Sequence, residues 1–300
     1  IELGVDSRWF GGALTFGATV YQSNTLNQLL ETDLDPGTGY KKLYVQAGNV
    51  RNRGIEMTLG FNKKFGGFEY NSSVTATANR NKILKLASGV TNPITHEVFD
   101  LKDIVKGRFR LREGGELGDV YASERIKRDA NGYVDYTPGQ SLVTEPTTPY
   151  KLGSVNAKWN LGWKHGFSYK GFDLNMLFTA RLGGIVISKT QAALDKFGVS
   201  QASADARDAG GINIGEGLTI APQQFYDAVY NLDSYYVYSA TNVRLQELSL
   251  SYSLPKNFLG KTFKNVALSV YATNLWMIYN KAPYDPELTG STGTFGQGYD

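Results

Sequence analysis

The sequence contains no cysteine, only two histidines and no long apolar run. The lack of cysteine excludes a disulfide-stabilised scaffold and zinc sites built on thiolates. Because no stretch of about 18 apolar residues occurs, no segment is predicted to cross a membrane as a helix. The formal net charge is only +3, and no basic run is interleaved with aromatic residues. These features argue against a nucleic-acid partner.

Residue patterns for catalysis are missing as well. His96 lies beside Glu97 without a second histidine at helical spacing, so the His-Glu-x-x-His zinc motif is absent. His165 alternates with Trp163 and Phe167 near a turn, which favours a packing role. No Gly-x-Ser-x-Gly elbow, phosphate-binding loop or dinucleotide fingerprint occurs. We therefore predict no catalytic residues, no metal site, no cofactor and no enzymatic activity.

The chain is instead rich in strand formers and turn formers, with 19 tyrosines, 15 phenylalanines and 34 glycines. Apolar and polar residues alternate on both sides of Gly66-Gly67. The apolar positions before this pair are Ile55, Met57, Leu59 and Phe61, and those after it are Phe68, Tyr70, Val74, Ala76 and Ala78. A period of two is typical of a sheet with one apolar and one polar face, and a glycine pair is typical of a tight hairpin.

The same pattern recurs along the chain around Gly11-Gly12, around Lys170-Gly171 and on both sides of Pro255. The sequence therefore predicts eight strands in four hairpins. Links within hairpins are short. Links between hairpins are long and span about Glu31 to Asn52, Lys82 to Lys158 and Leu182 to Ala240, with a tail from Lys281. Several long loops are uncommon in compact soluble domains, whereas outer-membrane barrels have short periplasmic turns and long extracellular loops.

Aromatic residues near the turns and near the far strand ends fit the two interfacial girdles of a membrane barrel. They are Phe10, Phe65, Phe68, Tyr169, Phe172 and Tyr252 at the turns, and Tyr21, Trp159, Trp276 and Tyr279 at the far ends. A β-sandwich produces the same alternation, with the apolar face as its core. The loop asymmetry favours the barrel, in which the apolar face meets lipid and the polar face meets a wet lumen.

Two loop segments have local signals of their own. "DANGYVDYTPG" (Asp129 to Gly139) predicts a β-turn or small hairpin, and its acidic spacing fits a calcium loop poorly. "SKTQAALDKFGVSQASADARD" (Ser188 to Asp208) predicts one or two short, solvated helices from its Ala, Gln and Lys content.

Four segments together resemble the C-terminal barrel of SusC/RagA-type TonB-dependent transporters of Bacteroidetes. They are "GNVRNRGIEMTLGF" (48–61), "FSYKGFDLNMLFTARLGG" (167–184), "NVRLQELSLSYSLP" (242–255) and "YATNLWMIYNKAPYDPEL" (271–288). The resemblance runs nearly end to end and in the family's order. It implies an outer-membrane barrel of about 22 strands with an N-terminal plug, driven by TonB and closed outside by a SusD-like lipoprotein.

The resemblance defines the predicted fold: all-β, an antiparallel transmembrane β-barrel segment with about eight of those strands. Residues 1–300 are expected to be one partial barrel, because neither a plug domain nor a TonB box occurs in the sequence. The chain opens inside an alternating run, and the last strand with its C-terminal aromatic is missing too. We therefore expect a section of a longer protein. A self-contained eight-stranded barrel, acting as an enzyme or adhesin, fits less well.

The predicted function is active import of a nutrient, an oligosaccharide or a peptide, across the bacterial cell outer membrane. The implied partners are a SusD-like surface lipoprotein, TonB acting through the N-terminal part, outer-membrane lipid and the substrate, with no nucleic acid. Contacts with substrate or lid are predicted for loop residues Tyr235, Tyr236, Tyr238, Tyr284, Asp285 and Glu287. The alternative is a surface or secreted β-sandwich that binds glycans or acts as an adhesin.

The segment Asn242 to Pro255 departs from simple alternation. Its apolar parity changes between Leu245 and Leu248. A bulge produces such a change. In a tall barrel it also marks the level where a strand leaves the bilayer, and we expect the latter. Leu250 is assigned to the lipid face and Ser251 to the lumen.

Overall fold

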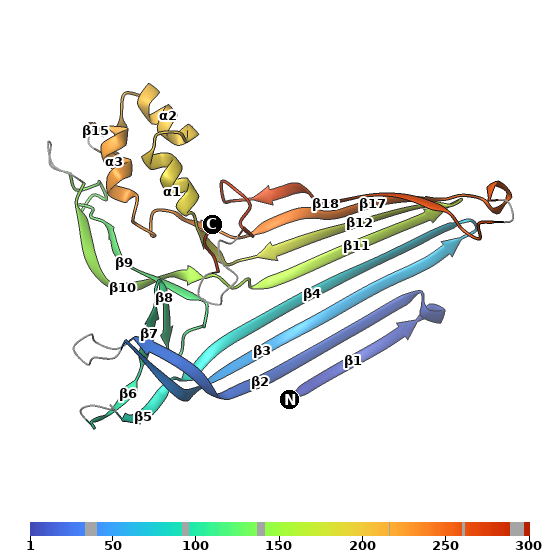
Figure 1. Ribbon diagram of the computed structural model, residues 1–300, viewed down its shortest axis with the longest axis horizontal. Helices are drawn as coiled ribbons and strands as arrows, with labels where there is room; N and C mark the ends of the chain where they lie inside the picture. Colours follow the sequence, from blue (N-terminus) through green and yellow to red (C-terminus); the bar gives the residue numbers. More distant parts are fainter. Residues whose placement is uncertain (34–40, 92–95, 137–141, 216, 260–261, 289–296) are drawn as a thin grey trace.

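The computed structural model describes residues 1–33, 41–91, 96–136, 142–215, 217–259, 262–288 and 297–300. Its largest part is one antiparallel sheet of eight strands in the order β1-β2-β3-β4-β11-β12-β17-β18 (Figure 1). The predicted pairing of eight strands into four hairpins is confirmed. The strands are β1 (Glu2–Trp9), β2 (Leu14–Asp33), β3 (Lys42–Phe65), β4 (Phe68–Lys85), β11 (Trp159–Tyr169), β12 (Phe172–Leu182), β17 (Asn242–Ser253) and β18 (Ala267–Asn280).

The short turns gather at one end of the sheet, and the remaining elements gather at the other (Figure 1). Between β11 and β12, Lys170 and Gly171 both have positive φ angles of 48° and 86°, as a type I′ turn requires. Gly66 has φ 62° between β3 and β4. The β1–β2 link is the 3₁₀ turn η1 (Phe10–Gly12). Glycine at these positions allows a reversal that matches the strand twist.

The predicted loop from Glu31 to Asn52 is wrong over most of its length. β2 and β3 stay paired from Leu14 opposite Phe61 to Asp33 opposite Lys42. The ladder continues because backbone hydrogen bonds need no alternation of apolar side chains. Only residues 34–40 of this predicted loop lie outside the described residues. The β2–β3 hairpin therefore reaches well beyond the neighbouring strands.

The register places apolar residues of all the inner strands on one face. Opposite Leu59 lies Val74, which is followed across the sheet by Trp163, Phe178, Leu245 and Trp276. This face is open: Leu59 is 47% exposed, and Trp163 and Leu250 are each 49% exposed. A β-sandwich would bury these residues as its core. The structure contradicts that alternative.

A bulge at Gln246 explains the change of parity in β17. Leu177 of β12 lies opposite Glu247, whereas the next residue, Phe178, lies opposite Leu245. The extra residue keeps Leu245 and Leu248 on the same apolar face. The bulge, not a change of the face that β17 presents, therefore accounts for the change of parity. Gln246 donates a hydrogen bond of 2.7 Å to Asn274, a positive-φ residue at a matching irregularity in β18.

At the other end of the sheet, the long connections fold into a layer of short elements, here called the loop layer. Its hydrophobic core includes Phe109, Ile187, Val229 and Tyr236. The loop layer contains β5 (Ala87–Thr91), β6 (Val98–Leu101), β7 (Asp103–Lys106), β8 (Phe109–Arg112), β9 (Asp119–Ile126), β10 (Thr144–Ser154), β13 (Ile185–Ile187), α1 (Lys189–Lys196), α2 (Gln201–Asp208), β14 (Ile212–Gly215), β15 (Leu218–Ile220), α3 (Pro222–Val229) and β16 (Val237–Ser239).

The two predicted helices between Ser188 and Asp208 are confirmed as α1 and α2. Ser188 and Ser200 cap them by accepting hydrogen bonds from backbone N–H groups. The expectation that they are solvated is wrong for α1, because Ala192 is fully buried in the loop-layer core. Among the described residues, no helix is long and apolar enough to span a membrane.

Two further expectations meet the structure here. The hairpin within Asp129 to Gly139 is confirmed: Asp129 Oδ1 accepts hydrogen bonds of 2.9 Å from the N–H groups of Asn131 and Tyr133. Residues 137–139 lie outside the described part. Tyr21 is not in the outward-facing girdle. Its hydroxyl reaches Asn79 on the polar face, and its ring lies over Gly54, where an added Cβ would come within 2.3 Å.

Candidate functional site

The six predicted contact residues come from two segments that meet above the sheet. Tyr235, Tyr236 and Tyr238 lie in or just before β16, whereas Tyr284 and the two acidic residues follow β18. The rings of Tyr238 and Tyr284 meet edge to face with centroids 6.4 Å apart. Residues nearly 50 positions apart in sequence are therefore neighbours. The structure brings the two predicted segments together.

Tyr235 and Tyr236 are adjacent in sequence but lie in different environments. Tyr236 is fully buried in the loop-layer core, so it offers no surface for a substrate or a lid. Tyr235 is 40% exposed, and its ring packs against Phe225 with centroids 5.6 Å apart. Burial raises the pKa of Tyr235 to about 12, so its hydroxyl remains a hydrogen-bond donor at neutral pH.

Tyr235 also lines a hollow of about 480 Å³ in the loop layer. Arg125 and Glu145 form an ion pair of 2.7 Å at this hollow. Arg128 lies close by and donates a hydrogen bond of 2.9 Å to the carbonyl of Gly132. The hollow offers both signs of charge and a tyrosine. Its lining residues are Arg125, Ile126, Arg128, Asp129, Glu145, Tyr150, Ser234 and Tyr235.

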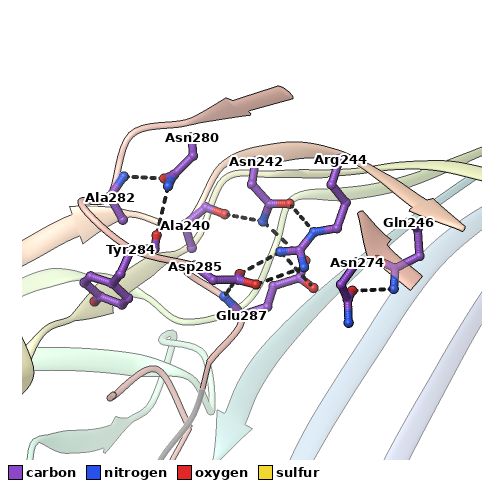
Figure 2. A network of polar contacts seen from close by, with 10 residues as sticks. All are labelled: Ala240, Asn242, Arg244, Gln246, Asn274, Asn280, Ala282, Tyr284, Asp285 and Glu287. Atoms are coloured by element: carbon purple, nitrogen blue, oxygen red, sulfur yellow. Dashed lines mark hydrogen bonds and ion pairs between the residues drawn. The ribbon is translucent and has the colours of Figure 1, made fainter. Parts of the chain in front are cut away.

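Asp285 and Glu287 belong to an ion-pair network around the buried Arg244 (Figure 2), and their own side chains stay 34% and 39% exposed. Arg244 of β17 is only 4% exposed and binds both carboxylate oxygens of Asp285, at 2.7 and 3.1 Å. A second ion pair of 3.3 Å joins Arg244 to Glu287. Asn242 donates a hydrogen bond of 3.2 Å to Glu287 and accepts one of 3.4 Å from Arg244. The network ties β17 to the segment after β18.

The electrostatics of Asp285 follow from this network. Burial alone raises the pKa of its carboxyl group, but the hydrogen bonds from Arg244 and from the Glu287 N–H outweigh that effect. The pKa therefore lies below its ordinary range, and Asp285 stays ionised at neutral pH. A bidentate arginine–carboxylate pair is geometrically specific. Sequence reasoning missed Arg244 and Asn242, although both lie at polar positions of a quoted motif.

A second hollow, of about 430 Å³, lies on the polar face of the sheet where the strands meet the loop layer. Tyr21 closes one side of it. Asn81 of β4 connects the sheet to the loop layer at this hollow, because its Oδ1 accepts a hydrogen bond of 3.0 Å from the Leu117 N–H. The hollow is rich in amides, which donate and accept hydrogen bonds without charge. Its polar side chains are Tyr21, Glu56, Thr77, Asn79, Asn81, Glu116, Asn156, Asn160 and Gln297.

In the described part of the chain, no three His, Cys, Asp or Glu residues come together in a group that could hold a metal ion. His165 has a packing role, as predicted: it stacks on Tyr70 and Phe167, and its Nδ1 lies 2.9 Å from the Tyr70 hydroxyl.

An antiparallel sheet with a bare apolar face, a polar face, tight turns at one end and a folded loop layer at the other is a strip of a β-barrel wall. The chain is 27% identical to TonB-dependent receptor P3 of Formosa agariphila over 314 aligned residues, covering 96% of this chain and 30% of the relative. It is 23% identical to TonB-dependent receptor SusC of Bacteroides thetaiotaomicron, covering 95% and 29%. No protein-family model matches.

Solved structures show the same fold. The RagAB peptide transporter matches with a TM-score of 0.69 at 18% identity, covering 99% of this chain and 32% of that one. The RagAB peptide importer in its open-open state matches with a TM-score of 0.63, covering 100% and 32%. The predicted resemblance to the barrel of SusC/RagA-type TonB-dependent transporters is confirmed. The chain spans about a third of the length of these relatives.

Proposed function

We propose that this chain is part of the wall of an outer-membrane barrel that imports a nutrient, and that it is not an enzyme. The observation that carries the proposal is the extended apolar face of the eight-stranded sheet, which remains exposed and continues through the Gln246 bulge. An apolar face of this extent is stable against lipid and unfavourable in water. The whole of residues 1–300 belongs to the barrel in this proposal, and the plug and the TonB box lie elsewhere in the protein.

The polar face then lines the path of the substrate. The amide-rich hollow beside Tyr21 and the charged hollow beside Tyr235 lie in or next to the loop layer, at the end of the sheet away from the tight turns. Tyrosine and amide groups suit hydrogen bonding and stacking on an oligosaccharide or a peptide. The relatives support this substrate range, since one is named SusC and another a peptide transporter.

We further propose that the loop layer contacts a SusD-like surface lipoprotein, and that TonB drives the import. Tyr235, Tyr238 and Tyr284 are the candidate contacts from the predicted set. Asp285 and Glu287 act indirectly, by holding the segment that carries Tyr284 against Arg244.

The membrane assignment is tested by single cysteines at Leu59 and Thr58, adjacent residues of β3 on opposite faces. In whole cells, a lipid-soluble maleimide should label Leu59→Cys and a water-soluble maleimide should not. Thr58→Cys faces the proposed lumen. When the lumen is accessible to solvent, the water-soluble maleimide should label it better than the lipid-soluble one. Equal labelling of both sites by the water-soluble reagent would contradict the proposal. Uptake of a labelled oligosaccharide and a labelled peptide, compared with a deletion strain, tests the transport step.

A further inference from the structure

A basic cluster lies on the outward face of the sheet, directly above its apolar residues. In the first row above the apolar residues Val20, Ile55 and Ala78, Gln22 of β2 faces Arg53 of β3, which faces Arg80 of β4. In the next row Asn24 faces Arg51, which faces Lys82. Side chains two residues apart on a strand point to the same face. These four cations therefore share the face of Ile55 and Ala78, and together they form the outward basic cluster.

The cluster brings like charges together without compensation. Directly opposed residues on neighbouring strands have Cβ atoms only about 5 Å apart, and like charges there are destabilising. Arg53 and Arg80 are such a pair, and so are Arg51 and Lys82. Arg53, Arg80 and Lys82 are exposed, and Arg51 is half-buried.

No carboxylate of the described chain neutralises this charge. None of the four residues belongs to an ion pair within the described ranges. The Arg53 guanidinium donates a hydrogen bond to the neutral amide of Gln22. On β2, the facing residues Gln22 and Asn24 are both uncharged. The repulsion therefore calls for an anion from outside the described chain.

We infer that the outward basic cluster binds the phosphate groups of an anionic lipid at the loop-layer side of the membrane. The inference rests on the proposed membrane location. The position of the cluster along the strands favours this ligand. A lipid whose acyl chains cover Ile55 and Ala78 places its headgroup at the next row of residues, beside Arg53 and Arg80. Arginine binds phosphate through two parallel hydrogen bonds, and paired cations at a membrane surface attract anionic headgroups.

The test uses the whole protein purified in dodecyl maltoside, with lipid binding measured by native mass spectrometry. The probes are a diphosphorylated lipid A and the same lipid with both phosphates removed. The unsubstituted protein should retain the phosphorylated lipid and not its dephosphorylated counterpart. The double variant Arg53→Gln, Arg80→Gln should lower the affinity about thirtyfold, as expected for two basic residues at a charged lipid surface.

A control of equal net charge acts at the other end of the strands, through Lys63→Gln on the outward face of β3 with Lys170→Gln in the β11–β12 turn. This control should leave affinity unchanged. An equal loss in both double variants would overturn the inference, because binding would then follow net charge alone. Release of the lipid by low concentrations of inorganic phosphate would also overturn it, since the site would then take free phosphate. Arg53→Lys with Arg80→Lys should lose less affinity than the double glutamine variant, because lysine keeps the charge but not the two parallel hydrogen bonds.

Failure of the inference is separable from failure of the proposed function. A protein that needs detergent and imports nutrient but ignores the phosphorylated lipid would refute the lipid site alone. A protein that stays soluble and monomeric without detergent would refute the membrane location, and the lipid site with it.

Discussion

The eight-stranded sheet and the loop layer use apolar residues in opposite ways. In the sheet, apolar side chains such as Leu59 and Val270 face outward, and Val270 is 76% exposed. In the loop layer, Phe109, Val120 and Tyr236 are each no more than 1% exposed. In the proposed membrane location, the apolar face of the sheet meets lipid, whereas the loop layer meets water. A single chain therefore leaves apolar residues open along its long strands and buries them where its connections fold into the loop layer.

The largest expected effect tests the sheet. Leu250→Arg places a cation on the lipid face of β17, where it costs about 2–4 kcal/mol near the middle of a bilayer. Ser251→Arg, the matched control, puts the same side chain on the polar face. We expect Leu250→Arg to reduce the folded, membrane-inserted fraction severely and Ser251→Arg to reduce it little. Heat-modifiable migration of the membrane fraction on gels measures that fraction. Equal losses would mean that the two faces do not differ.

The next effect tests the loop layer. Tyr236→Ala removes a fully buried aromatic ring and should destabilise the loop-layer core by about 3–5 kcal/mol. Because the sheet does not depend on this core, the barrel should still insert while its loops become sensitive to added protease on whole cells. Tyr235→Ala, at a 40% exposed site, should leave protease resistance nearly intact. Loss of insertion in Tyr236→Ala would show that the two regions fold as one unit.

A smaller effect is expected at the link between the two regions. Asp285→Ala leaves the buried Arg244 guanidinium without its bidentate partner, at a cost of about 2 kcal/mol. Glu287→Ala removes a single longer contact of 3.3 Å and should cost less. Protease cleavage within residues 281–288 is the measurement, and it should be faster in the Asp285 variant. The reverse order would assign the anchoring role to Glu287.

The smallest expected effect depends on pH. Glu31, near the end of β2, forms ion pairs of 2.7 Å with Lys106 and 2.8 Å with Lys42. Hydrogen bonds from Lys106, then Lys42, lower the pKa of its carboxyl group to about 2. A carboxylate with a depressed pKa stabilises the fold above its ordinary pKa, and that contribution disappears as the pH falls toward about 2.

Spin labels at the exposed residues Leu26 and Val105 report the distance between the β2 extension and β7. We expect this distance to broaden between about pH 5 and about pH 2. In Glu31→Gln it should be broad throughout, with little further dependence on pH. A pH response that survives in Glu31→Gln would place the titrating group elsewhere.

The regular half of the fold could be predicted, because alternation and turn residues are local signals. Leu59 and Thr58 could be assigned to opposite faces from parity alone, and Lys170-Gly171 could be placed in a turn from its chemistry. The β2–β3 extension was missed because strand pairing there depends on backbone hydrogen bonds, which leave no pattern of side chains. The short strands of the loop layer carry too few residues for a period to appear.

The candidate site was only partly predictable. Tyr235, Tyr238 and Tyr284 were found from local aromatic content, and the structure places them near one another or beside a hollow. Arg244 could not be assigned, because an arginine in a strand gives no sign of the acidic loop that will cover it. For the same reason Tyr236 could not be separated from Tyr235.

The sequence by itself determined which residues lie on each face of the sheet and where the hairpins turn, since side-chain direction follows a period of two and turns need positive φ angles. Tertiary structure alone decided how the faces stay continuous and what the loops enclose. The Gln246 bulge keeps Leu245 and Leu248 on the same face, and it does so because pairing with β12 fixes the register on both sides of the bulge. The Arg244–Asp285 pair forms only because the chain returns over β17 after β18, which brings two carboxylates to a buried guanidinium.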